Sequence, residues 1–242
     1  MSLAIPFAKF HGAGNDFVVV DAAQLPPGLE LSALARALCD RHRGAGADGL
    51  LVASPGVDSD LSMAIHNADG SEDTMCGNGV RCLIRHAIDT GRAPQVGVVA
   101  TRSGPVPYRA FDSGAVEVQL SEPRFSPEAI PATSPSTMDV PVAGIRVDLL
   151  NTGSAHAVAF VDALPDPATV RLRSPAVEND PRFPERVSVM WTRIERRDRI
   201  RIAIWERGVG ETLACGTGAV AAVVASARRG WVDAEVEVES PG

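Results

Sequence analysis

An internal repeat is the feature that most constrains how this 242-residue chain can fold. Residues 72–91 read EDTMCGNGVRCLIRHAIDTG, and residues 211–230 read ETLACGTGAVAAVVASARRG. In each copy a glutamate stands four residues before a CGxG motif, and a glycine follows fifteen residues after the cysteine. A weaker match pairs residues 12–21 with residues 153–162. The chain is therefore expected to consist of two related halves.

Local patterns predict that each half is mainly β-strand. Valine- and isoleucine-rich runs bounded by Gly, Pro or Asp predict strands, at residues 17–21, 61–65, 96–100, 116–120, 145–150, 157–161, 187–194, 200–205 and 236–238. After CGNG the apolar residues fall at helical spacing, and residues 219–227 are apolar on all sides, which requires a buried helix. Gly91 and Gly230 suit the left-handed position that ends a helix. Another helix is expected from Ser32, as its N-cap, to about Arg41.

These patterns predict an α+β protein of two pseudo-symmetric domains, each a mostly antiparallel sheet wrapped round a central helix. The Pro- and Ser-rich stretch of residues 121–141 shows no periodic pattern and is the expected boundary. The N-terminal half is then residues 1–120, and the C-terminal half is residues 121–242. The active site is expected in the cleft between them.

Composition excludes several classes of function. The net charge is −7 and the chain has no long block of basic residues, so nucleic acid is not expected as a partner. The start lacks a secretory pattern and the longest apolar stretch is too short to cross a membrane, which predicts a cytoplasmic protein. Lys9 is the only lysine, and an enzyme using pyridoxal phosphate would have to use it.

The four cysteines are Cys39, Cys76, Cys82 and Cys215. They are too few for a disulfide framework and form no CxxC pair, so a structural metal site is not expected. Cys39 lies beside an apolar helical stripe and is expected to be a core thiol. Cys82 and His86 have a spacing that could hold a metal, but no third ligand accompanies them.

Cys76 and Cys215 each stand just ahead of a predicted helix. The positive end of the helix dipole and unpaired backbone N–H groups lower the pKa of such a thiol. If the two repeats face each other, one thiolate can remove a proton from a carbon beside a carboxylate while the other thiol protonates the opposite face. Simple core packing or a redox dithiol are the alternatives.

Five segments, taken in order, resemble the diaminopimelate epimerase family: FAKFHGAGNDFVVVD, RHRGAGADGLLV, HNADGSEDTMCGNGVRC, FPERV and WERGVGETLACGTGAVAA. The resemblance implies a cofactor-independent isomerase that interconverts LL- and meso-2,6-diaminopimelate in lysine and peptidoglycan precursor biosynthesis. It implies a small-molecule amino-acid substrate and leaves a homodimer open. The related alternative is a racemase of another amino acid that also works without pyridoxal phosphate.

The resemblance also implies roles for individual residues. The expected catalytic residues are Cys76, Cys215, His156 and Glu206. The expected substrate-binding residues are Asn15, Asn67, Gly77, Asn78, Arg207, Gly216 and Thr217. A guanidinium such as that of Arg207 can grip a distal carboxylate through two hydrogen bonds.

Three positions depart from the family pattern. Ser154 stands where the family often has the asparagine of GNPH, Ser188 follows FPERV in place of asparagine, and Gly49 occupies a position that is glutamine in some members. A serine keeps one hydrogen bond but lacks the reach of an amide, so contacts with the distal end of the substrate are expected to weaken. The chain is also expected to be short for two complete halves, since it stops at Gly242.

Overall fold

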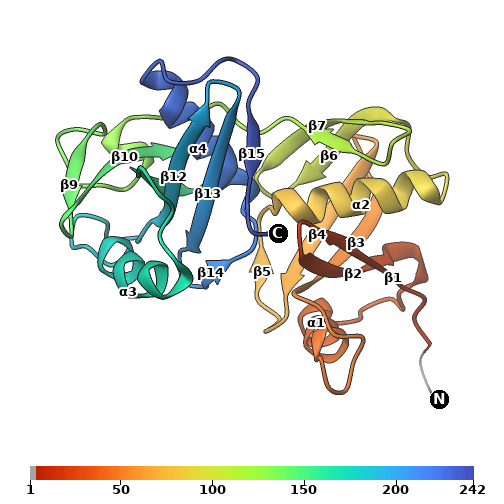
Figure 1. The fold of residues 1–242 in the computed structure, drawn as a ribbon. Helices are drawn as coiled ribbons and strands as arrows, with labels where there is room; N and C mark the ends of the chain where they lie inside the picture. Colours follow the sequence, from red (N-terminus) through yellow and green to blue (C-terminus); the bar gives the residue numbers. More distant parts are fainter. Residues whose placement is uncertain (1–3) are drawn as a thin grey trace. The chain divides into compact units, whose positions relative to one another are not determined.

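A computed structural model describes residues 4–242, so residues 1–3 of the expected N-terminal half lie outside it. The chain divides into two compact units, Met1–Gln119 and Leu120–Gly242 (Figure 1). No helix in the described range is long and apolar enough to span a membrane.

The first unit is an eight-stranded, mostly antiparallel sheet with two helices. Its elements are β1 (Ala8–Gly12), β2 (Asn15–Asp21), a 3-10 helix (Ala22–Gln24), α1 (Leu31–Cys39), β3 (Gly49–Pro55), β4 (Leu61–Asn67), β5 (Glu72–Asp73), α2 (Gly77–Asp89), β6 (Val96–Thr101), β7 (Gly104–Ala110) and β8 (Val116–Val118). The sheet order is β1-β2-β3-β4-β6-β7-β8, and β5 pairs with the end of β4.

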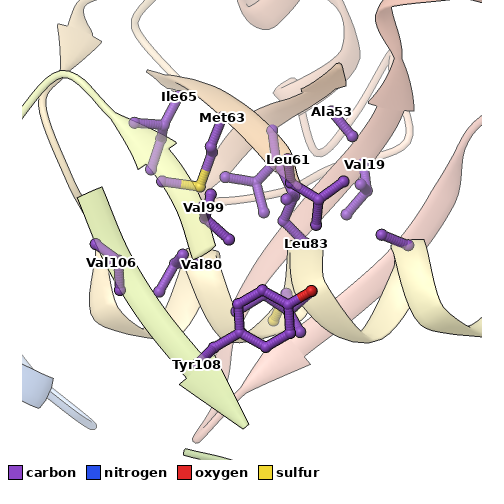
Figure 2. Close-up of a cluster of buried hydrophobic side chains, with 14 of the residues drawn as sticks. Val19, Ala53, Leu61, Met63, Ile65, Val80, Leu83, Val99, Val106 and Tyr108 are labelled. Carbon is purple, nitrogen blue, oxygen red and sulfur yellow. The ribbon is translucent and has the colours of Figure 1, made fainter. Parts of the chain in front are cut away.

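The sheet of this unit is buried on both faces. Val19 and Leu51 face the core that contains α2, whereas Val18 and Leu50 face the core that contains α1. A strand covered on both faces can be apolar throughout, which explains why the sequence of β2 does not alternate. Figure 2 shows the α2 side, where Leu83 and Val80 of the helix point at Met63, Val99 and Tyr108 of the sheet.

The second unit is a seven-stranded sheet, again with one helix on each face. Its elements are a 3-10 helix (Pro127–Ala129), β9 (Val140–Val142), β10 (Ile145–Asn151), β11 (Ala155–Phe160), α3 (Pro167–Glu178), β12 (Ser188–Arg196), β13 (Arg199–Glu206), β14 (Gly210–Thr212), α4 (Gly216–Arg228) and β15 (Glu237–Glu239). The order is β14-β13-β12-β11-β10-β9, with β15 also on β13. Ala221 and Ala222 of α4 are completely buried, but Val223 and Val224 are only partly buried and Ala227 is exposed, so the prediction of a helix buried on all sides holds for one face only.

The repeat in the sequence is also a repeat in topology. In the first unit, β1 pairs antiparallel with β2, β2 parallel with β3 and β3 antiparallel with β4. In the second unit β10, β11, β12 and β13 pair in the same order and the same senses. The last strand of each set then pairs antiparallel with a short strand, β5 or β14, and parallel with β6 or β15. The predicted α+β fold of two pseudo-symmetric, mostly antiparallel sheets is confirmed.

The prediction for the first helix was wrong at both ends. The helix starts at Leu31, and Glu30 rather than Ser32 occupies the N-cap position. It ends at Cys39 because the carboxylate of Asp40 accepts the backbone N–H groups of His42 and Arg43 in a tight turn. Gly91 and Gly230 do adopt the left-handed conformation expected after α2 and α4, with φ of 69° and 73°.

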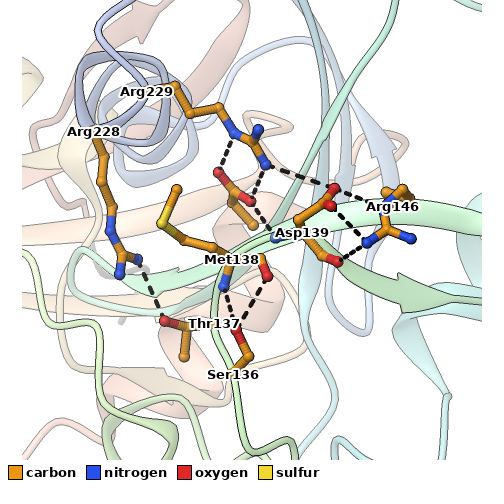
Figure 3. A network of polar contacts seen from close by, with 8 residues as sticks. Ser136, Thr137, Met138, Asp139, Arg146, Arg228 and Arg229 are labelled. Carbon is orange, nitrogen blue, oxygen red and sulfur yellow. Dashed lines mark hydrogen bonds and ion pairs between the residues drawn. The ribbon is translucent and has the colours of Figure 1, made fainter.

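A buried ion pair anchors the end of α4 to the sheet of the second unit (Figure 3). Arg229 donates from Nε and Nη2 to the two carboxylate oxygens of Asp148, each at 2.7 Å. Asp148 is only 1% exposed, and it also accepts the backbone N–H of Asp139 at 2.8 Å. Arg228 also donates to the hydroxyl of Thr137. Polar contacts with the end of α4 therefore hold this part of the expected boundary stretch in place.

Candidate active site

Each repeat places its cysteine at the N-cap of a buried helix. Cys76 precedes α2 and Cys215 precedes α4, and both have extended backbone angles with φ of −132° and −137°. The backbone N–H of Gly79 donates to Cys76 Sγ at 3.4 Å. None of the four cysteines is part of a disulfide bond. Both helix starts therefore place a sulfur at the N–H groups of the first helical turn, as the sequence predicts.

The second glycine of each CGxG motif is required by packing. A Cβ atom on Gly218 would lie 2.5 Å from Met190 Sδ of β12 and 3.2 Å from Cys215 Sγ. A Cβ atom on Gly79 would lie 3.1 Å from the side chain of Leu51 in β3. These glycines let the first turn of each helix press against the sheet, which fixes the position of the neighbouring cysteine.

A polar chain orients the side chain that contacts Cys76. Asn15 Nδ2 donates to Asp48 Oδ2 at 2.9 Å, so Asn15 Oδ1 points to Cys76 and accepts from Sγ at 3.8 Å. Arg41 donates to Asp48 at 2.8 Å and to Asp16 at 2.7 Å. Burial raises the pKa of Asp16, but hydrogen bonds from Arg41 and Lys9 outweigh this effect and hold that pKa well below its usual range. The chain's only lysine thus belongs to a structural ion pair.

Cys215 has a different environment, and the lowered pKa predicted from its place at a helix start is wrong for this thiol. Burial, together with the negative charge of Glu206, raises the pKa of the Cys215 thiol to about 12. The hydroxyl of Thr217, 3.5 Å from Cys215 Sγ, and the N–H of Gly218 oppose this shift but do not cancel it. Cys215 is consequently a thiol at neutral pH, able to give a proton rather than take one.

His156 lies in the same unit, completely buried on β11. Its Nε2 is 3.0 Å from Ser154 Oγ. Burial, with the positive charge of Arg207 as a smaller cause, lowers the pKa of His156 to about 3. The imidazole is therefore neutral at physiological pH and acts as a hydrogen-bonding group there.

The buried histidine predicts how stability changes with pH. In the unfolded chain its pKa returns to about 6.5, so below that pH the unfolded state binds a proton that the folded state excludes. Stability is then lost as the pH falls from about 6.5 toward 3. Between pH 7 and pH 5 we expect this residue alone to remove about 2 kcal/mol of unfolding free energy, measured by urea titration with tryptophan fluorescence. The His156→Gln variant should lose less unfolding free energy over this pH range. Equal losses in the variant and the wild-type protein would contradict the low pKa of the buried His156.

Glu206 and Arg207 sit on the turn between β13 and β14. Thr212 donates its hydroxyl to Glu206 Oε1 at 2.6 Å, and Ser188 Oγ accepts the backbone N–H of Arg207 at 3.1 Å. The guanidinium of Arg207 donates to the carbonyl of Glu185 at 2.9 Å. The same turn is held from α3, because the buried carboxylate of Glu178 accepts the N–H of Gly208 at 2.8 Å.

The remaining predicted site residues divide between the two units. Gly77 and Asn78 form the first turn of α2, and Asn78 is buried with its Oδ1 accepting from Arg81 at 2.6 Å. Gly216 and Thr217 form the first turn of α4. Asn67 ends β4 and donates to the hydroxyl of Ser71 at 3.0 Å.

Several residues around the candidate site were missed by sequence reasoning or read differently. Asp48, in the loop before β3, was not predicted as a site residue, but its carboxylate orients Asn15. The repeated glutamates, Glu72 and Glu211, form ion pairs with Arg102 and Arg171. The apolar pattern of a sequence cannot reveal such partners, because they come from segments that lie far apart along the chain.

The other two cysteines are structural. Cys39 is buried in the core beneath α1, as expected, and burial raises the pKa of its thiol. Cys82 is buried in the core around α2, and burial raises its pKa to about 11. His86 Nε2 lies 3.5 Å from the carboxylate of Asp21. Within residues 4–242 no group of three or more His, Cys, Asp or Glu is placed to hold a metal ion.

Comparison with known proteins matches most of the chain to one family. The family model described as diaminopimelate epimerase matches residues 7–126 and 149–242. The diaminopimelate epimerase of Ectopseudomonas mendocina is 40% identical, covering 99% of this chain and 89% of that protein. The diaminopimelate epimerase of Rhizorhabdus wittichii is 42% identical, covering 99% of this chain and 86% of that protein.

Solved structures with this fold include other racemases and epimerases. A probable proline racemase from Agrobacterium radiobacter has a TM-score of 0.66 at 20% identity, covering 94% of this chain and 78% of that one. A hydroxyproline epimerase from Agrobacterium vitis has a TM-score of 0.64 at 18% identity, with the same coverage. At this identity the likeness concerns the fold. With the family match and the curated relatives, it follows that this chain belongs to the diaminopimelate epimerase family and is an isomerase.

Proposed function

We propose that this chain interconverts LL- and meso-2,6-diaminopimelate by proton transfer between one α-carbon and two thiols, Cys76 and Cys215. The observation that carries the proposal is the pair of cysteines, each at the N-cap of a helix in a repeated topology. The family supplies the substrate, because the curated relatives are named diaminopimelate epimerases. The product would feed lysine and peptidoglycan precursor synthesis.

In the proposed reaction one thiolate takes the α-proton and becomes a thiol, while the other thiol gives its proton to the opposite face and becomes a thiolate. The raised pKa of Cys215 supports its assignment as the acid of the free enzyme. Cys76 then acts as the base for that direction, and the roles exchange in the reverse reaction. No proton is gained or lost by the protein over the two transfers.

The helix starts would stabilise the carbanion. Charge released at the α-carbon spreads onto the adjacent carboxylate, and backbone N–H groups in the first turns of α2 and α4 are suited to receive it. Gly77 and Asn78 supply these groups at Cys76, and Gly216 and Thr217 supply them at Cys215. Such preorganised donors make an electron-withdrawing cofactor unnecessary for the step.

Three residues are proposed to hold the distal end of the substrate, namely Asn15, Asn67 and Arg207. The guanidinium of Arg207 donates from Nη1 to the carbonyl of Glu185, and its other N–H groups can serve as donors to a carboxylate. Its backbone is fixed by Ser188. Glu206 and His156 are proposed to adjust the protonation of Cys215, the first by its charge and the second through neighbouring hydroxyls.

The test is a stereochemical assay with the fully reduced, full-length protein. LL-Diaminopimelate should convert to the meso form. A reaction started from the meso form should approach the same mixture of the two isomers. Absence of conversion from both directions would overturn the proposal.

A racemase of another amino acid is the second candidate. The short side chains of Ser154 and Ser188 favour it, because each replaces the amide that is common in the family. Turnover of diaminopimelate, proline, hydroxyproline and glutamate measured side by side separates the candidates. A redox dithiol would instead show activity that cycles with formation of a disulfide, whereas a Cys76–Cys215 disulfide should abolish epimerisation.

A further inference from the structure

A row of three polar side chains leads from Cys215 into the interior of the second unit. Cys215 Sγ is 3.5 Å from Thr217 Oγ1, Thr217 Oγ1 is 3.4 Å from Ser154 Oγ, and Ser154 Oγ is 3.0 Å from His156 Nε2. The row joins α4 to β11 through the turn that precedes β11. It ends on an imidazole with no exposed surface.

The row has no counterpart at the other cysteine. In the repeat Ala13 occupies the position of Ser154, Asn15 that of His156 and Asn78 that of Thr217. Cys76 therefore contacts the side-chain oxygen of Asn15, whose amide is held in one orientation and accepts a hydrogen bond from the thiol. Cys215 meets a hydroxyl, which can donate to a thiolate or accept from a thiol.

We propose that Ser154 is a positioning residue that sets the protonation behaviour of Cys215 through the hydroxyl of Thr217. This inference rests on the proposed function for its catalytic meaning. In the thiolate state, His156 Nε2–H donates to Ser154 Oγ, the Ser154 hydroxyl donates to Thr217 Oγ1, and the Thr217 hydroxyl donates to Cys215 Sγ. Each donor in such a row strengthens the next one.

The row can serve both protonation states without moving a proton along its length. When Cys215 takes a proton from carbon, the Thr217 hydroxyl rotates and accepts from the new S–H, donating in turn to Ser154 Oγ. Ser154 Oγ then accepts from both Thr217 and His156, as its two lone pairs allow. Only hydroxyl rotations are needed. The contacts of 3.4 and 3.5 Å are long for hydroxyl hydrogen bonds, and catalytic contacts commonly shorten when substrate binds.

The charged and titratable groups around Cys215 explain why the hydrogen bonds of the row matter for its protonation. Glu206, at the end of β13, favours the thiol through its negative charge. His156, on β11, is neutral, and Arg207 acts on His156 through its positive charge. The Thr217 hydroxyl and the Gly218 N–H are the groups that favour the thiolate. A base that must form a thiolate beside a carboxylate depends on those few donors.

The experiment measures the reactivity of each thiol without using catalysis. The folded, full-length protein is treated with iodoacetamide between pH 6 and pH 10, and alkylation is followed by mass spectrometry of tryptic peptides. Cys215 is the only cysteine in residues 208–228, and Cys76 is the only one in residues 44–81, so each thiol is read separately.

For Ser154→Ala we expect alkylation of Cys215 to slow about threefold to tenfold at fixed pH, with the profile moved to higher pH and Cys76 unchanged. Ser154→Thr, which keeps a hydroxyl, should restore the rate. Thr217→Val should also slow the alkylation of Cys215. Adding Ser154→Ala to that variant should change the rate little further, because the row of hydrogen bonds is already interrupted at Thr217.

An unchanged profile of Cys215 in Ser154→Ala overturns the inference. So does an equal change at Cys76, which would indicate general loosening, or additive effects in the double variant. If Ser154→Ala fails to fold, the comparison of Thr217→Val with the Thr217→Val, Ser154→Thr double variant decides, since the row predicts equal rates. The outcome is separate from the proposed function: a wild-type protein that does not epimerise diaminopimelate overturns that function, whereas the alkylation profile tests the row alone.

Discussion

Replacing Cys76 or Cys215 with serine is expected to lower the rate of epimerisation about a hundredfold to ten-thousandfold, the usual contribution of a positioned acid or base. A serine hydroxyl has nearly the same size as a thiol but ionises far less readily, so it serves poorly both as base and as acid. Each variant keeps the thiol on one face. The Cys215→Ser variant should therefore still exchange the α-proton of one isomer with solvent while failing to produce the other.

Epimerisation is measured as conversion of LL to meso substrate, and exchange is measured by loss of the α-proton signal in deuterated water. Cys39→Ala is the matched control, because Cys39 is the last residue of α1, is buried in the core on that side of the sheet and takes no part in the proposed site. It should retain most activity. Near-normal rates in both serine variants would show that the two-thiol mechanism is wrong.

Loss of Arg229 is expected to destabilise the second unit by about 3–5 kcal/mol, the range for removing one partner of a buried ion pair. Arg229→Met leaves the carboxylate of Asp148, which is 1% exposed, with only the N–H of Asp139 as a partner. Arg229 also stacks over Phe160 and Trp231, so methionine retains part of the packing but not the charge. The dominant effect is therefore the unpaired carboxylate.

The measurement is urea unfolding followed by tryptophan fluorescence. Trp191, Trp205 and Trp231 are the three tryptophans, and all lie in the second unit, so the signal reports on that unit. Arg146→Met is the control, since Arg146 pairs with Asp139 at the surface, where solvent screens the charges, and its loss should cost much less than the loss of Arg229. A loss for Arg229→Met no larger than that for Arg146→Met would contradict the assigned role of the buried pair.

Much of the architecture could be predicted because it depends on local patterns repeated twice. The helices after each CGxG motif, their glycine ends and most strands follow from apolar spacing within a few residues. Helix α3 has no such signal, because Pro175 interrupts its pattern and its apolar residues are few. Strand β3 was also missed. Its residues are apolar on both faces, so the sequence lacks the alternation of apolar and polar residues that marks a strand with one buried face.

The site could be predicted only in part, for a different reason. The two cysteines are marked by their position before a helix, which the sequence shows directly. Their partners come from distant segments: Asp48 reaches Asn15 from the loop before β3, and Ser154 reaches Thr217 across many residues. The raised pKa of Cys215 depends on burial beside Glu206, which no local pattern encodes. The sequence thus indicates the two candidate thiols, and the fold determines the environment that sets their protonation.

The most direct test of the two-thiol account is solvent isotope incorporation during the first turnovers of LL-diaminopimelate in deuterated water. With separate acid and base, the meso product should carry deuterium at the inverted α-carbon, while the remaining LL substrate stays largely protonated at early times. Mass spectrometry of the two separated isomers gives both values. Equal deuterium in substrate and product at early times, or a product that retains the original proton, would contradict the account.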